Sequence, residues 1–544
     1  MKIIIIGGVA GGMSAATRLR RLQEDAEIIV LERGPHVSYA NCGLPYFVSG
    51  KIAKREALLL QTPEALYKRF RIDVRVNTEA VSIDPAKKIV SWHNPVTGAE
   101  GTENYDALIL SMGAEALLPD VPGAENALTL RDVVDADALK AAVDAAGGAP
   151  AVVLGAGFVG LEVAENLREL GLPVTVVQRN EQILTPLDAE LALLVHQELV
   201  KNGVDIILGA EAARITENSV ELTDGRSIPA AVVLSSIGVS PDIRIAQEAG
   251  LSIGPRGGIS VDEQQRTSDD SIYAIGDAVE KHNRAGDAVL IPLANLANRH
   301  GRLVADVISG REARAQKSTG TAIIGLFDIA AAMTGASEKQ LVAAGREHKV
   351  IHLHPASHAG YYPGAKPISL KVMFEPATGL ILGAQAVGAD GVDKRIDVIA
   401  TAMAGGLTID DLMDLELAYA PQFGSAKDAI NQTGYVGSNV FHGDTPTVQW
   451  HELDARLGPD VTLIDVRDPH ENEAGSIPGA VNIPVNQLRE RMAEVGDGQV
   501  IVYCQVGQRG HTATQILRGH GKQVWNLDGG YKTWRAGMDA RSLV

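Results

Sequence analysis

Two segments of this chain share one order of elements: an apolar strand, a glycine-rich loop, an amphipathic helix, and a second strand that ends in polar residues. The first segment spans residues 2–32 and the second spans residues 151–178. In such a βαβ unit, glycines let the backbone turn tightly beside a pyrophosphate, which meets the positive end of the helix. The pattern predicts an α/β protein that contains two Rossmann-like dinucleotide-binding domains.

The first loop departs from the usual G-x-G-x-x-G spacing, because Val9 takes the place of the middle glycine. Glu32 compensates for this, since it ends the second strand and an acidic residue there can bind the ribose of an adenosine. We therefore expect a dinucleotide to contact this loop and this acid. The loop residues are Gly7, Gly8, Val9, Ala10, Gly11 and Gly12.

The length and the charge of the chain limit its domains and partners. At roughly 150 residues per domain, the chain is long enough for about three to four domains. The formal net charge of −18 argues against a nucleic acid or an anionic membrane as partner. The apolar run Ile3–Ile6 is too short for a secretion signal, and no apolar run has the ~18 residues of a membrane span. We expect a cytoplasmic protein without a metal site.

The chain contains two cysteines, Cys42 and Cys504, which lie in different motifs. We expect two separate reactive thiols rather than a structural disulfide. Because no second cysteine lies near Cys42, its thiol must cycle against a mixed disulfide, a persulfide or a sulfenic acid. Such a cycle favours a thiolate with a low pKa.

Four segments follow one another in the order seen in the pyridine nucleotide-disulfide oxidoreductases: the first loop, residues 108–114, 235–241 and 267–277. The chain resembles this family, and the resemblance implies FAD in the first site, with Asp277 on the ribityl chain of the flavin. It also implies cofactor contacts for Arg33, Asn41, Gly113, Gly238, Gly276, Leu293, Ala294 and Ala297.

The second loop is a full G-x-G-x-x-G, and in a flavoprotein with two sites it implies a nicotinamide cofactor. Its strand ends at Gln178, followed by Arg179. Glutamine removes the acidic charge that would repel a 2′-phosphate, and an arginine can pair with that phosphate, which favours NADPH. Glutamine can also bond a ribose hydroxyl, so the choice between NADH and NADPH stays open. The residues expected at this cofactor are Gly155, Gly157, Phe158, Val159, Gly160, Glu162, Gln178 and Arg179.

The segment Ser38–Tyr46 resembles the coenzyme A-disulfide reductase branch, which includes single-cysteine NADH oxidases and persulfide reductases. The similarity covers about residues 1–440 and implies a homodimer. Tyr419 and Tyr361, with Tyr362 as an alternative to Tyr361, would reach the cysteine from the partner subunit. The resemblance places coenzyme A against Ser14, Arg18, Arg21, Ser38, Asn41 and Lys427. Arg18 and Arg21 are three residues apart on one helix face, as a phosphate clamp requires.

The C-terminal part resembles a rhodanese domain in residues 463–467, 475–484 and 526–531. Cys504 opens a loop that leads into a helix, so backbone N–H groups and the helix dipole favour its thiolate and its persulfide. Arg509 would add positive charge to this catalytic loop.

These segments predict four domains. They are an FAD domain (1–112 and 250–320), an NAD(P) domain (113–249), an α+β dimerisation domain (321–440) and an α/β rhodanese domain (448–544). Strands are expected at 323–327 and 370–374, a helix at 397–404, and a linker at 440–447.

Our hypothesis is an NAD(P)H-dependent flavoenzyme in which the flavin passes electrons to the sulfur on Cys42. The substrate would be coenzyme A persulfide, coenzyme A disulfide or polysulfide, which the sequence does not rank. Cys504 would carry sulfane sulfur, and whether it exchanges sulfur directly with Cys42 stays open. One alternative is an NADH oxidase or peroxidase that cycles Cys42 through sulfenic acid. Another is a redox-responsive binding protein.

Overall fold

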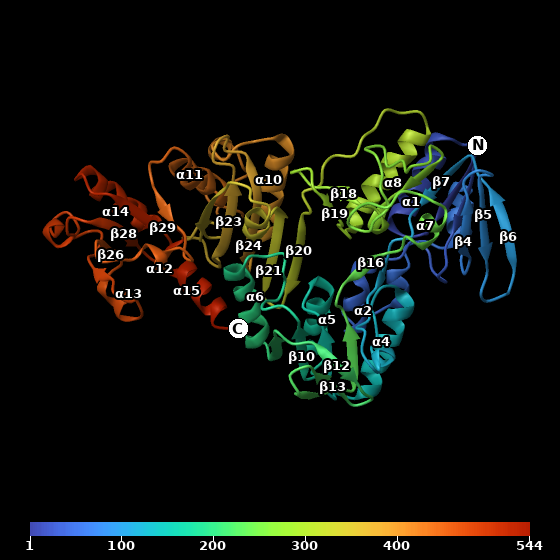
Figure 1. Cartoon of the computed structure of the whole chain (residues 1–544), viewed down its shortest axis with the longest axis horizontal. Helices are drawn as coiled ribbons and strands as arrows, with labels where there is room; N and C mark the ends of the chain where they lie inside the picture. The colour runs from blue at the N-terminus through green and yellow to red at the C-terminus, as the bar shows by residue number, and fades with distance from the viewer. Residues whose placement is uncertain (544) are drawn as a thin grey trace. The chain divides into compact units, whose positions relative to one another are not determined.

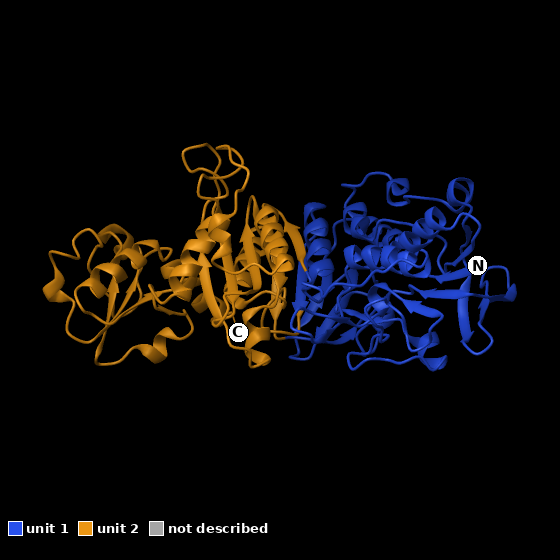
Figure 2. Ribbon diagram, turned by 90° about the horizontal axis from the view of Figure 1, so that it is seen from above, with its two compact units in different colours: residues 1–177, 210–320 blue, residues 178–209, 321–544 orange. Residues whose placement is uncertain are grey.

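The computed structural model describes residues 1–543 and divides the chain into two compact units (Figure 2). Unit 1 consists of residues 1–177 and 210–320, and unit 2 consists of residues 178–209 and 321–544.

A five-stranded parallel sheet, of order β17-β7-β1-β2-β3, forms the centre of the first half of unit 1. Its inner strands are continuous runs of buried Ile, Leu and Val, as expected for a parallel sheet covered on both faces. Helices α1 and α8 pack against each other beside it (Figure 1). The bounds are β1 Lys2–Ile6, β2 Glu27–Leu31, β3 Asp73–Arg75, β7 Ala107–Leu110, β17 Ile272–Ala274, α1 Ala10–Leu22 and α8 Ala294–Ile308.

A second parallel arrangement in unit 1 places β9 between β10 and β15. Helix α5 follows β9 directly, so the glycine loop between them meets the helix N-terminus. The bounds are β9 Ala151–Leu154, β10 Val174–Gln178, β15 Val232–Ser235, α4 Val133–Ala146 and α5 Phe158–Glu169.

Smaller elements complete unit 1 and connect the two nucleotide loops. The antiparallel sheets are β4-β5-β6, β12-β13-β14, β8-β16 and β18-β19. Their bounds are β4 Glu79–Asp84, β5 Ile89–His93, β6 Glu100–Asn104, β8 Ala114–Ala116, β12 Ala212–Ile215, β13 Ser219–Leu222, β14 Ser227–Pro229, β16 Val239–Pro241, β18 Lys281–His282 and β19 Ala288–Val289. The short helices are η1 Asn41–Gly43, α2 Leu44–Val48, η2 Arg55–Leu58, α3 Pro63–Phe70, η3 Ala124–Asn126, α7 Arg244–Glu248 and η4 Gly276–Ala278.

The first part of unit 2 is built on an antiparallel sheet of order β20-β21-β24-β23-β22. Helix α10 packs on β21 and β24, and α11 packs on β22, which closes one apolar core (Figure 1). The bounds are α6 Ala189–Lys201, β11 Val204–Leu208, β20 Ala322–Leu326, β21 Ile329–Gly335, α9 Glu338–Ala343, β22 Lys349–Leu353, β23 Ile368–Phe374, β24 Ile381–Gly388, α10 Val392–Gly405, η5 Asp411–Asp414 and α11 Ala429–Phe441.

The second part of unit 2 is a parallel sheet of order β25-β29-β28-β26-β27 with helices around it. Helix α15 packs against α6, so this C-terminal part is joined to the rest of unit 2 by more than its linker. The bounds are β25 Thr447–Val448, α12 Leu453–Arg456, β26 Val461–Asp465, α13 Pro469–Glu473, β27 Val481–Asn482, η6 Met492–Glu494, β28 Gln499–Tyr503, α14 Gln508–Gly519, β29 Val524–Leu527 and α15 Gly530–Arg541.

This architecture confirms the predicted α/β fold class. The helix expected at 397–404 lies inside α10, and the strands expected at 323–327 and 370–374 correspond to β20 and β23 within a few residues. The domain boundaries stay predictions. No helix among the described residues is long and apolar enough to span a bilayer.

Candidate functional site

The two glycine loops of unit 1 have the same local geometry. Gly7 and Gly155 each have φ of +99°, and a Cβ atom there would lie 2.2 Å from the Ser111 carbonyl oxygen or 2.3 Å from that of Ser236. Only glycine fits such a close approach of two backbones in the left-handed region. Backbone N–H groups at the start of a helix point outward beyond its N-terminus, toward the preceding loop. No side chain caps the N-terminus of α1 or α5, so no side chain takes up these N–H groups. Both loops therefore fit a bound pyrophosphate.

Glu32 lies at the end of β2 with 8% of its surface exposed. Its carboxylate accepts hydrogen bonds from the backbone N–H groups of Gly8 at 2.7 Å and Gly34 at 2.8 Å. Burial raises the pKa of Glu32. Arg33 points instead to the surface, where it pairs with Glu115 at 3.1 Å and Asp242 at 3.2 Å.

The family segment 267–277 ends in η4, where the carboxylate of Asp277 accepts a hydrogen bond from Arg131 at 2.7 Å. Lys281 is buried nearby and donates to the carbonyl oxygens of Gly276 at 2.6 Å and Val279 at 3.0 Å. Burial lowers the pKa of Lys281 to about 8. The sequence did not predict Arg131 or Lys281 at this site, because neither belongs to a recognised motif. Arg131 bonds Asp277, which is distant in sequence, and Lys281 bonds backbone carbonyl oxygens.

The reactive segment is attached to the first glycine loop. Ser38 has φ of +49°, and its N–H donates to the carbonyl oxygen of Gly8 at 2.8 Å. Cys42 then lies in the single turn η1, exposed at the surface, directly before α2. Asn41 is half-buried beside it. Cys42 therefore lies at the surface on a segment bonded to the first glycine loop, and its role as the reactive thiol stays a prediction.

The charge environment of Cys42 differs from the expectation. Partial burial first, and the carboxylate of Glu162 second, raise the pKa of the thiol, whereas a low pKa was predicted. Glu162 lies one turn into α5, beyond the second glycine loop, and burial raises its own pKa to about 7, with a contribution from Glu165. The prediction missed this acid as a neighbour of the thiol, because the two residues lie far apart in the sequence.

Three of the residues expected at coenzyme A contact other parts of this chain, and their role at coenzyme A stays a prediction. Arg18 donates from Nε at 3.0 Å and Nη2 at 2.7 Å to one carboxylate oxygen of Asp306. Arg21 is exposed, with its guanidinium 6.0 Å from the ring centre of Phe70. Ser14 donates to Asn298 at 2.7 Å. Helical spacing placed the two arginines on one face but carried no information on their partners.

The second nucleotide site continues at the end of β10, where Gln178 is buried and Arg179 is exposed. In unit 2 the hydroxyl groups of Tyr361 and Tyr419 lie 2.7 Å apart, and both side chains are exposed. This hydrogen bond raises the pKa of Tyr361. Tyr362 instead packs edge-on against a histidine ring.

The second thiol, Cys504, is buried at the end of β28 and opens the loop that leads into α14. Residues 526–531, called the closing motif from here on, lie beside this loop together with Lys532. The N–H of Tyr531 donates to the carbonyl oxygen of Cys504 at 2.8 Å, and the N–H of Lys532 donates to that of Gln505 at 3.1 Å.

Arg509, expected to add charge to this loop, has an acidic partner that the sequence reading missed. Its two terminal nitrogens donate to the two carboxylate oxygens of Glu471 at 2.6 and 2.7 Å. Asp468 lies 3.5 Å away. The hydrogen bonds from Arg509 lower the pKa of Glu471 to about 2. The positive charge of the loop is therefore balanced.

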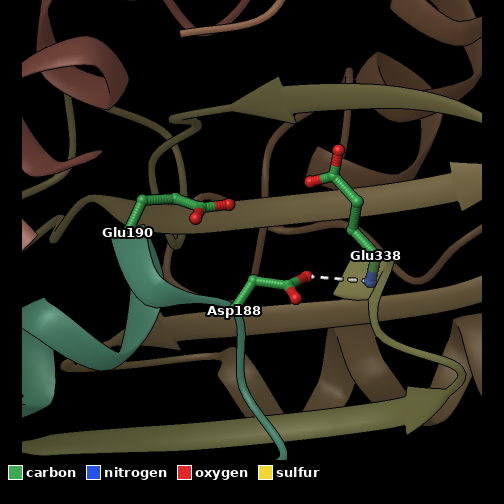
Figure 3. A group of neighbouring side chains, drawn as sticks. All are labelled: Asp188, Glu190 and Glu338. Carbon is green, nitrogen blue, oxygen red and sulfur yellow. Dashed lines mark hydrogen bonds between the residues drawn. The ribbon is translucent and has the colours of Figure 1, made fainter. Parts of the chain in front are cut away.

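Three carboxylates, those of Asp188, Glu190 and Glu338, converge in the interior of unit 2 (Figure 3). The ammonium group of Lys371, which is completely buried, lies 3.0 Å from Asp188, 2.5 Å from Glu190 and 2.5 Å from Glu338. A lysine side chain thus supplies the cation at this cluster.

His352 extends the same cluster to the C-terminal sheet. Its Nε2 lies 3.1 Å from Glu190, and its Nδ1 lies 2.6 Å from Asp528 in the closing motif. Burial disfavours the imidazolium, but the two carboxylates outweigh burial and raise the pKa of His352 to about 9. A buried ionic network therefore links α6, the antiparallel sheet and the motif that supports Cys504.

Three family models match the chain. The pyridine nucleotide-disulphide oxidoreductase model matches residues 1–301, the dimerisation domain model of the same family matches residues 321–429, and the rhodanese-like domain model matches residues 449–537. The chain belongs to the pyridine nucleotide-disulphide oxidoreductase family. It is thus an oxidoreductase that also carries a rhodanese-like domain, as the sequence motifs predicted.

Similar proteins extend this assignment. A coenzyme A disulfide reductase of Staphylococcus aureus is 35% identical over 438 residues, which cover 80% of this chain and 99% of that protein. The crystal structure of reduced Bacillus anthracis CoADR-RHD is 44% identical, covers 99% of this chain and 98% of that chain, and has a TM-score of 0.98. A NAD-dependent persulfide reductase from A. fulgidus is 35% identical with a TM-score of 0.91, and covers 98% of this chain and all of that one.

Proposed function

We propose that this protein is an NADH-dependent FAD enzyme that reduces coenzyme A persulfide or coenzyme A disulfide at Cys42. The observation that carries the proposal is the position of Cys42, an exposed thiol on a segment bonded to the first glycine loop and electrostatically coupled to Glu162 of the second. The names of the Staphylococcus aureus and A. fulgidus relatives support the same substrate class.

Each cofactor would be held by the loop that fits a pyrophosphate. FAD would contact residues 7–12, Glu32 and Asp277, and the nicotinamide cofactor would contact residues 155–160 and Gln178. When bound, the flavin supplies the path for two electrons from the nicotinamide to the sulfur on Cys42. Arg131 would orient the carboxylate of Asp277 toward the flavin, because it already holds that carboxylate at 2.7 Å.

The sulfur chemistry falls to Cys42. Its thiolate attacks the inner sulfur of a coenzyme A persulfide, the S–S bond breaks, and hydrosulfide leaves, so that coenzyme A remains on Cys42 as a mixed disulfide. Two electrons from NADH then cleave this disulfide, which returns the Cys42 thiolate, coenzyme A thiolate, NAD⁺ and a proton. With coenzyme A disulfide as substrate, coenzyme A thiolate leaves in the first step instead.

The enzyme acts as a homodimer in which one hydroxyl of the Tyr361–Tyr419 pair donates to the other, and the second donates to the thiolate that leaves in the active site of the partner subunit. The 2.7 Å bond between their hydroxyl groups favours Tyr361 over Tyr362 in this role. Cys504 carries sulfane sulfur as a persulfide, stabilised by the loop N–H groups at the start of α14.

The deciding experiment is anaerobic oxidation of NADH and NADPH by the purified enzyme, with coenzyme A persulfide, coenzyme A disulfide and polysulfide offered separately. We expect faster turnover with NADH, release of sulfide or thiol, and loss of both in Cys42→Ser but not in Cys504→Ser. Turnover that requires oxygen and proceeds without a sulfur substrate would overturn the proposal and leave an NADH oxidase.

A further inference from the structure

Two arginines lie close to Cys504, and each is paired with a carboxylate. Arg467 is buried and donates to both carboxylate oxygens of Asp465, at distances of 2.7 to 3.1 Å. Arg509 makes the two-bond pair with Glu471. The guanidinium groups therefore add little net positive charge at the thiol, and backbone N–H groups remain as the main anion-stabilising feature of the loop.

The two pairs differ in position. Arg467 stacks on the ring of Tyr531 at 4.3 Å and supports the loop from the protein interior. The side chains of Arg509 and Glu471 are 33% and 23% exposed, so solutes can reach this pair from the solvent. Arg509 is the second residue of α14, which follows directly after the loop that Cys504 opens. The hydrogen bonds to Glu471 are the main cause of the raised pKa of Arg509, and the charge of Cys504 is a smaller one.

We propose that Glu471 determines which sulfur donors react at Cys504, by cancelling the charge of Arg509 so that dianionic donors are disfavoured and persulfides of thiol carriers are accepted. This inference rests on the proposed function of Cys504 as a carrier of sulfane sulfur. A dianion drawn to Arg509 also meets the carboxylate of Glu471, and a second acid, Asp468, lies at 3.5 Å from the guanidinium. A persulfide brings at most one negative charge to the same place.

Both donor reactions transfer one sulfur atom to the same thiolate. With a persulfide R–S–SH, Cys504–S⁻ attacks the outer sulfur and the S–S bond of the donor breaks. R–S⁻ is released, and the product on the enzyme is Cys504–S–SH. With thiosulfate, Cys504–S⁻ attacks the sulfane sulfur and the S–S bond of the donor breaks. Sulfite is released, and the product on the enzyme is Cys504–S–S⁻. The difference lies in the charge of the donor, two for thiosulfate and none or one for the persulfide.

The test is Glu471→Gln in the full chain that also carries Cys42→Ser, so that Cys504 is the one thiol of the chain able to accept sulfur. Glutamine preserves the side-chain acceptor for the N–H of Asp468, which closes the capping box of α13, and so removes charge with little change of local structure. Glu473→Gln, an exposed acid on the same helix, is the matched control.

The rate of sulfur transfer to Cys504 is measured by mass spectrometry with thiosulfate and with the persulfide of 2-mercaptoethanol, whose carrier is uncharged, as separate donors. Removing one negative charge about 6 Å from a dianion raises the thiosulfate rate about tenfold even in a water-like dielectric. We expect that rise in Glu471→Gln, a change below about threefold with the persulfide, and neither change in Glu473→Gln. Adding Arg509→Gln to Glu471→Gln removes the gain.

Three outcomes overturn the inference. An unchanged or slower thiosulfate reaction in Glu471→Gln, with the persulfide reaction intact, refutes the specificity role and leaves the carrier role of Cys504 standing. An equal rise with both donors shows that charge does not discriminate between them. Failure of every donor to load Cys504 in every variant removes the carrier role and the inference together.

Discussion

The buried cluster around Lys371 makes a strong prediction about stability. Lys371→Met keeps most of the side-chain volume but removes the cation shared by Asp188, Glu190 and Glu338. The basic neighbours that remain include His352 at 3.1 Å from Glu190 and His451 at 3.8 Å from Glu338. A buried charge that loses its closest partner is costly, because water is excluded and the remaining basic groups do not balance three acids.

The size of the effect follows from the burial of the ammonium group. Breaking a buried ion pair on one side costs about 3–5 kcal/mol, and Lys371 is completely buried against three acids. For a unit of this size, that loss lowers the midpoint of thermal unfolding by roughly 10 °C. The loss shrinks as the pH falls toward 5, because the uncompensated carboxylates of the variant take up protons, whereas Lys371 keeps the pKa of Glu190 in the wild type well below its usual range.

Differential scanning calorimetry and urea unfolding at pH 5 and pH 8 measure this effect. Lys366→Met, at an exposed lysine of unit 2, is the control and leaves the free energy of unfolding within about 0.5 kcal/mol of the wild type. A loss below about 1 kcal/mol in Lys371→Met at pH 8, or a loss of equal size at both pH values, refutes the reasoning.

Three further predictions concern single side chains. The folded-state pKa of His352 is raised to about 9 from 6.5, so its stabilising contribution is complete below pH 6.5 and is lost as the pH rises through 9. Urea unfolding from pH 6 to 10 therefore shows a loss of unfolding free energy on the order of 3 kcal/mol, which His352→Gln abolishes. A wild-type stability that does not change with pH contradicts a charged imidazolium. Glu162→Gln removes a negative charge beside Cys42 and lowers the pKa of that thiol, so iodoacetamide alkylates it about two- to fivefold faster at pH 8. An unchanged alkylation rate shows that Glu162 does not act on the thiol. Arg131→Met frees the carboxylate of Asp277 and weakens FAD retention about tenfold, measured by flavin fluorescence after dialysis. Unchanged FAD retention contradicts the role of Arg131 in orienting Asp277.

The sequence alone determined the features that depend on neighbours along the chain. The strand Ile3–Ile6, the glycines of both loops and the helices after them form within about 30 residues, and their spacing is the physical requirement for binding a pyrophosphate. The same holds for Cys504, whose loop and helix are contiguous. The four motif segments likewise identified the family, because a shared cofactor constrains each of them.

Only the tertiary structure decided which charges meet. Arg18 pairs with Asp306, and Arg509 pairs with Glu471. The sequence predicted a role at coenzyme A for Arg18 and at the Cys504 loop for Arg509 but neither acidic partner, because an ion pair depends on distances in space that spacing along the chain does not encode. The pKa of Cys42 was predicted in the wrong direction for the same reason, since burial and Glu162 act through space.

The cluster of Lys371 shows the limit most clearly. Its acids come from the start of α6 and from α9, the lysine comes from β23, and His352 joins them to Asp528. Each of these residues reads in the sequence as an ordinary surface charge, because charged side chains are usually exposed. Folding buries them together, and the low dielectric of the interior strengthens the interactions between their charges. Removing one of these charges therefore leaves an uncompensated buried charge and destabilises the protein.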